Sequence, residues 1–181
     1  MRTNYHVAKL ALFNIRLLNV IQNNQSNEIV ELIKSECERN GFSSPPSLLH
    51  QGAFLAHAYI CVVWLWESVK KARLAQDFLS EFPKTASRFN LSLPPKEKIY
   101  GPRNLENWEQ VLRLIRNALS HGKVEIDDNY YLLSDQKQSG RFKETEKTCL
   151  KLTWEDFGKL SEVCIHALTP TLYPNHSAYA S

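Results

Sequence analysis

The stretch that decides the fold is residues 104–121, which read NLENWEQVLRLIRNALSH. Apolar residues recur in it every three or four positions, the spacing of a helix face that packs against a core. They are Leu105, Trp108, Leu112, Ile115 and Leu119. Gly122 follows at the position where a left-handed residue commonly ends a helix. The pattern predicts a helix over about residues 104–121 with one side buried.

The opposite side of this helix is mixed. Asn117 and His121 are four residues apart and lie above one another there, with arginines on the flank at 113 and 116. Three apolar residues, Val111, Leu114 and Ala118, neighbour them. Because a second apolar face on a helix indicates a second covering surface, we predict a homodimer that forms through this helix.

The rest of the chain has the pattern of a mainly α fold. Helical spacing and helix stop signals predict helices over about 5–22, 27–40, 47–73, 75–90, 104–121 and 154–168. Short β-like runs predict strands over about 123–127, 130–134 and 148–152, as a small antiparallel β-hairpin or three-stranded patch after the 104–121 helix. The polar stretch 134–147 is expected to be a loop, and 169–181 a loose tail. We therefore expect one helical domain over 1–168.

Composition is typical of a globular protein. The 181 residues are 43% hydrophobic and 23% charged, which excludes a disordered chain. The net charge of +3 permits a polyanionic partner without indicating one. Residues 48–66 carry no Asp, Glu, Lys or Arg, but His50, Gln51, Gly52 and His57 interrupt them. We interpret this run as a core helix, and we expect a cytoplasmic protein with no membrane association.

The residue types at the end of the 104–121 helix suit phosphodiester chemistry. Imidazole exchanges protons near neutral pH, and guanidinium stays charged and binds phosphate in a bidentate manner. RNA carries its own nucleophile, the 2′-hydroxyl, so its cleavage needs an acid or base and a cation but no metal. The four cysteines are widely spaced, and no histidines cluster at metal-ligand spacing. We expect neither a metal nor a cofactor.

Arg116 and His121 point about 140° apart on one helix, so a single copy brings them poorly together on one phosphate. Two copies around a twofold axis would bring them together.

The residues R-N-A-L-S-H at 116–121 match the signature of HEPN domains, which is Arg, a polar residue, three further residues and His. The stretch RLIRNALSHGKVEIDD at 113–128 is similar to stand-alone prokaryotic HEPN proteins, as are the following hairpin and residues 152–156. By order of elements the resemblance covers residues 48–168. It implies an HEPN-like helical bundle whose motif lies at the end of a late helix.

The resemblance also implies roles for the motif. Arg116 would contact the scissile phosphate, His121 would be a general acid or base, and Asn117 would orient His121 or the backbone. We expect Arg113, Ser120 and Lys123 to contact the substrate. Members with this signature are commonly metal-independent endoribonucleases that work as dimers, as toxins or in phage defence, so RNA and an antitoxin protein are the implied partners.

One position departs from the family pattern. HEPN toxins that are modified by a nucleotidyltransferase antitoxin carry a tyrosine two residues after the histidine, where this chain has Lys123. We therefore do not expect adenylylation at this motif.

Two other interpretations remain open. Residues 116–122 also form an ordinary helix end, in which Arg116 would pair with Glu109 or Glu125. Some HEPN domains are catalytically inactive and serve as binding or dimerisation modules, which is the alternative function for this chain.

Overall fold

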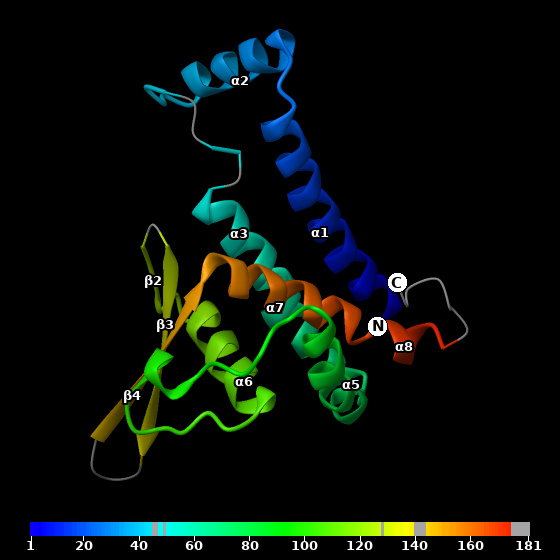
Figure 1. Cartoon of the computed structure of the whole chain (residues 1–181), viewed down its shortest axis with the longest axis vertical. Helices are drawn as coiled ribbons and strands as arrows, with labels where there is room; N and C mark the ends of the chain where they lie inside the picture. The colour runs from blue at the N-terminus through cyan, green and yellow to red at the C-terminus, as the bar shows by residue number, and fades with distance from the viewer. Residues whose placement is uncertain (45–46, 49, 128, 140–143, 175–181) are drawn as a thin grey trace.

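The computed structural model describes residues 1–174 except 45–46, 49, 128 and 140–143. It is predominantly helical, with a small antiparallel sheet at one end (Figure 1). In chain order the elements are α1 (Arg2–Asn23), α2 (Asn27–Arg39), α3 (Gln51–Ala58), the π-helix η1 (Tyr59–Trp64), α4 (Leu65–Lys71), α5 (Ala75–Arg88), the 3-10 helix η2 (Lys96–Lys98), β1 (Ile99–Tyr100), α6 (Trp108–Ser120), β2 (Val124–Ile126), β3 (Tyr130–Ser139), β4 (Glu144–Thr153), α7 (Trp154–His166) and α8 (Thr169–Leu172).

Helix α6 begins four residues later than the sequence predicts. Asn107 is its N-cap, and its side chain accepts a hydrogen bond from the Gln110 amide over 3.0 Å. This bond satisfies an amide that has no partner within the helix, which is why the helix starts at Trp108. At the other end, Gly122 has φ +63° and follows the C-cap His121, as predicted.

Both faces of α6 are buried within the chain. Val111, Leu114 and Ala118 are each at most 1% exposed, so the chain covers the second apolar face itself. Strand β3 and the π-helix η1 are the elements that α6 contacts most. The prediction that a second protomer covers these three residues is therefore wrong, because elements of the same chain, β3 and η1 among them, pack against the helix.

The predicted helix over 47–73 is a continuous helical stretch from α3 to α4, with a π-helix in its middle. It begins at Gln51. The preceding residue, His50, is the N-cap, and its Nδ1 accepts a hydrogen bond from the Gly52 amide over 3.0 Å. Residues 52–71 are long and apolar enough to cross a membrane, but 44% of their most apolar window is buried inside the fold. A core helix meets the same test of length and apolarity.

The sheet has the strand order β1-β4-β3-β2, and all pairs are antiparallel. It contains one more strand than the predicted patch. Strand β3 extends to Ser139 and β4 begins at Glu144, so these strands occupy most of the stretch expected to be a loop. Asp135 and Thr148 are directly opposite each other there and are 6% and 0% exposed. Buried polar strand residues look like loop residues in a sequence, which explains the error.

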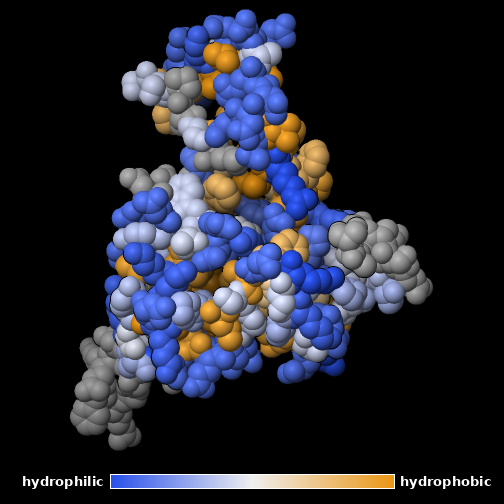
Figure 2. Space-filling view, in the orientation of Figure 1, coloured by the Kyte–Doolittle hydropathy of each residue, from blue (hydrophilic) through white to orange (hydrophobic). Residues whose placement is uncertain are grey.

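Two terminal regions complete the fold. The part of the expected tail nearest the core is helix α8, and Tyr5 on α1 hydrogen-bonds Thr169 between their hydroxyl groups over 2.7 Å. Residues 175–181 of that predicted tail lie outside the described part. Helix α2 and the adjoining end of α1 form an arm that projects from the body (Figure 1), and apolar side chains are visible on its surface (Figure 2).

Candidate functional site

Arg116 lies on the flank of α6 that faces α4. Its Nε donates to Glu67 Oε1 over 2.8 Å, and its Nη2 donates to the same oxygen over 2.5 Å. Glu67 also pairs with Lys70 over 2.8 Å. Hydrogen bonds from Lys70 and then Arg116 lower the pKa of the Glu67 carboxyl, so this group is a carboxylate at neutral pH. The partner of Arg116 is thus Glu67 on another helix, rather than Glu109 or Glu125.

Asn117 connects Arg116 to the sheet. Its Oδ1 accepts a hydrogen bond from Arg116 Nη1 over 2.6 Å, and its Nδ2 donates to Asp135 Oδ2 on β3 over 3.0 Å. Its side chain therefore orients Arg116, whereas the bond that joins Asn117 to His121 is between backbone atoms, from His121 N to Asn117 O. The prediction was that Asn117 orients His121 or the backbone, and in this structure its side chain contacts Arg116 and Asp135.

Asp135 accepts a second hydrogen bond. Arg103 Nη1, from the segment before α6, donates to Asp135 Oδ2 over 2.7 Å. Burial alone would raise the pKa of this carboxyl, but the hydrogen bonds from Arg103 and Asn117 outweigh burial, so the pKa is lowered. Asp135 is therefore a buried carboxylate with charged and neutral donors on the same oxygen.

These side chains form one polar chain that runs Lys70, Glu67, Arg116, Asn117, Asp135, Arg103. It joins α4, α6, β3 and the segment before α6, and its three cations and two carboxylates leave a net charge of +1. Because Glu67 on α4 and Asn117, itself bound to Asp135 on β3, both hold Arg116, the motif arginine has a defined orientation. Such an orientation suits a group that must meet a substrate charge.

His121 lies at the exposed end of the motif. It is the C-cap of α6, one helical turn beyond Asn117, and its side chain is exposed. Within the described part of the chain it makes no side-chain hydrogen bond or ion pair. The structure thus places the predicted general acid or base in solvent, and Arg116 toward α4.

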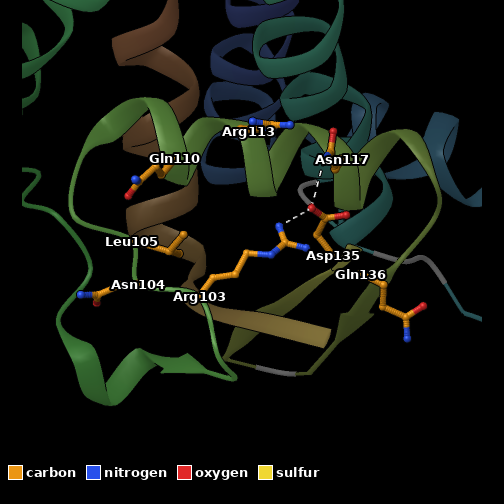
Figure 3. Close-up of a pocket in the computed structure, with 8 residues that line it drawn as sticks. All are labelled: Arg103, Asn104, Leu105, Gln110, Arg113, Asn117, Asp135 and Gln136. Atoms are coloured by element: carbon orange, nitrogen blue, oxygen red, sulfur yellow. Dashed lines mark hydrogen bonds and ion pairs between the residues drawn. The ribbon is translucent and has the colours of Figure 1, made fainter. Parts of the chain in front are cut away.

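A pocket of about 460 Å³ opens beside the polar chain (Figure 3). Helix α6 contributes three residues that recur along one face, Gln110, Arg113 and Asn117. Arg103 reaches across from the opposite wall, and Asp135 lies between Arg103 and Asn117. Of the three predicted substrate contacts, Arg113 lines this pocket. It lies on the same wall as the motif residue Asn117.

The other two predicted contacts lie elsewhere. Ser120 is the last residue of α6 and is exposed. Lys123 follows the helix, and its Nζ donates to Gln136 Oε1 over 3.2 Å. Neither residue lines the pocket, although Gln136 does.

Sequence reasoning did not identify Glu67, Arg103 or Asp135. Glu67 stands 49 residues from its partner Arg116, Asp135 stands 18 residues from Asn117, and Arg103 stands 32 residues from Asp135. No local pattern relates these residues. Asp135 stands among polar residues just after the apolar run 130–133, so no local pattern distinguishes it from a loop residue.

Comparison with known proteins identifies a family but no individual relative. The family described as HEPN pEK499 p136 matches residues 2–173. No curated protein and no solved structure matches the chain significantly.

Proposed function

Because the chain belongs to the HEPN family, we propose that it is a metal-independent endoribonuclease that cleaves RNA by attack of the 2′-hydroxyl. The observation that carries this proposal is the motif itself: an oriented guanidinium at Arg116 and an exposed imidazole at His121 on the same helix end. In this proposal Arg116 neutralises charge on the phosphate, and His121 transfers a proton to or from an oxygen of the reacting phosphodiester.

The donors of Arg116 support its role. A guanidinium has five N–H groups, and three are used, one on each nitrogen, toward Glu67 and Asn117. One N–H remains on each terminal nitrogen, Nη1 and Nη2. This pair suits a two-point contact with phosphate oxygens, while Glu67 and Asn117 keep the group in place.

A dimer completes the proposed site. Arg116 extends toward α4 and His121 is at the exposed helix end, so one copy does not direct both groups to one phosphate. We propose that the α6 ends of two protomers face one cleft, through the polar edge of α6, because its apolar faces are buried. By analogy with the family, the nuclease would be a toxin or a phage-defence enzyme with an antitoxin partner.

The test is cleavage of labelled single-stranded RNA in EDTA by the wild type and by His121→Ala, with analysis of the fragment ends. The proposal predicts fragments with a cyclic phosphate for the wild type and a loss of rate of about 100-fold or more for His121→Ala. The absence of cleavage across several RNAs, tRNA included, would overturn it.

Mixing two variants tests the composite cleft. Arg116→Ala and His121→Ala are each expected to be inactive alone. A heterodimer of the two retains one Arg116 and one His121 on different protomers, so a mixed sample should recover part of the activity. Failure to recover activity after verified subunit exchange would show that each protomer acts alone.

One observation favours the second function, an inactive HEPN binding module. Glu67 neutralises Arg116 within the chain, as expected for a structural ion pair. Such a module would bind RNA or a protein without cleaving RNA, and its binding would not depend on His121.

A further inference from the structure

The pocket beside the motif contains two arginines and one carboxylate, so one positive charge is left without a partner. Arg113 is exposed and, in the described part of the chain, makes no hydrogen bond or ion pair. Asp135, the carboxylate of the pocket, already accepts hydrogen bonds from Arg103 and Asn117. Arg113 therefore has no carboxylate of its own to neutralise it there.

Arg103 also has unused donors. Its Nε and Nη2 are buried without a hydrogen-bond partner, although its Nη1 contacts Asp135. Buried donors on a charged group are costly when they lack a partner, so a bound acceptor would stabilise this arginine. Arg103 lines the pocket opposite α6, and Arg113 lines it from α6 (Figure 3).

We propose that this pocket holds a phosphate group of the RNA strand next to the phosphate that Arg116 contacts. The proposal rests on the proposed function for the identity of the polymer. Two guanidinium groups on opposite walls match the oxygens of one phosphate, and Asn117 belongs both to the pocket and to the polar chain of Arg116. Phosphate contacts carry no base information, so this subsite positions the strand without selecting its sequence.

The experiment measures binding rather than cleavage. A fluorescent oligonucleotide of 2′-O-methyl RNA, which lacks the nucleophile, is titrated with the wild type and with Arg113→Gln over a series of salt concentrations. Arg113→Gln is expected to weaken binding about tenfold and to reduce the slope of log K against log salt by about 0.7, the value of one single-strand phosphate contact. Arg39→Gln, which removes an exposed arginine from distant α2, is the matched control and should change neither quantity.

Each result decides the proposal. Equal affinity and slope for wild type and Arg113→Gln would overturn it, even if the wild type cleaves RNA. An Arg113-dependent affinity in a protein that never cleaves RNA would support the subsite and remove the proposed function. Displacement of the oligonucleotide by a nucleoside monophosphate at constant ionic strength would show a free-nucleotide site and overturn the assignment to an RNA strand.

Discussion

Asn117 donates a hydrogen bond from Nδ2 to Asp135 Oδ2 over 3.0 Å, and this bond joins the motif helix to strand β3. Through its Oδ1 the same side chain holds Arg116. The second residue of the motif is therefore a connector between the motif arginine and a buried carboxylate, which gives the motif a structural role.

Asn117→Asp should destabilise the protein. The substitution keeps the size of the side chain but sets a second carboxylate at hydrogen-bond distance from Asp135, which is only 6% exposed. We expect a loss of about 2 kcal/mol in the free energy of unfolding at neutral pH, measured by urea denaturation. The loss should shrink in acid, where one carboxyl binds a proton.

Asn107→Asp provides the control on the same helix. Asp caps a helix as well as Asn does, so this variant should keep the wild-type stability. Equal stability of the two variants at neutral pH would contradict the connecting role of Asn117.

Glu67→Gln should affect activity more than stability. Glu67 is a positioning residue, since it accepts both Nε and Nη2 of Arg116. Its side chain is 36% exposed, so its removal should cost less than about 1 kcal/mol, whereas a displaced Arg116 should lower kcat about tenfold with little change in KM. Steady-state cleavage kinetics measure both parameters.

Glu81→Gln is the matched comparison. Glu81 has the same pairing with a lysine three residues later, Lys84, but no contact with Arg116. Its substitution should leave kcat at the wild-type value. An equal fall of kcat in both variants would show that Glu67 acts through surface charge alone.

Substitution of three glycines by alanine, one at a time, should change the free energy of unfolding by different amounts. At Gly101, φ is +118° and a Cβ would collide with the Lys147 carbonyl and approach Thr148 Cα to 2.9 Å, so we expect a loss of more than about 2 kcal/mol. At Gly122, φ is +63° with open space, and the loss should be about 1 kcal/mol. Gly158 lies inside α7 with open space, and alanine should stabilise it by about 1 kcal/mol.

Thermal denaturation of the three variants checks this order. Gly101 holds the segment before α6 against β4, where the Arg103 amide also contacts Thr148 Oγ1 over 3.4 Å. A Gly101→Ala protein as stable as the wild type would mean that this segment shifts without cost.

His57 should make the protein less stable in mild acid. It is 4% exposed and lies 3.7 Å from Cys61 Sγ through Nδ1, and burial lowers its pKa more than nearby Glu162 raises it. Below pH 6.5 the unfolded chain therefore binds a proton at this imidazole more readily than the folded chain does. The free energy of unfolding consequently falls as pH drops through and below that value. Denaturation of His57→Leu between neutral and mildly acidic pH should give a shallower dependence; an identical slope would refute this origin.

Much of the helical architecture follows from local signals. The apolar spacing of residues 104–121 predicts α6, Gly122 predicts its end, and Thr153 predicts the start of α7, where its side chain accepts a hydrogen bond from the Asp156 amide. The resemblance of residues 116–121 to the HEPN signature is confirmed by the family match over residues 2–173. These features depend on neighbours within one helical turn, which a sequence displays directly.

The errors share a physical cause. Val111, Leu114 and Ala118 form an apolar face that any partner could cover, and periodicity does not say whether the partner is a second protomer or a strand of the same chain. The buried polar pair Asp135 and Thr148 likewise gives β3 and β4 the composition of a loop.

The sequence by itself determined the motif helix, its end at Gly122 and its likeness to the HEPN signature at residues 116–121. Only the tertiary structure decided that Glu67 and Asp135 hold Arg116 and Asn117, and that Arg103 and Arg113 share a pocket. The reason is that these partners come from α4, β3 and the segment before α6. Their distances depend on how the elements pack together, and packing depends on the whole core rather than on any local stretch.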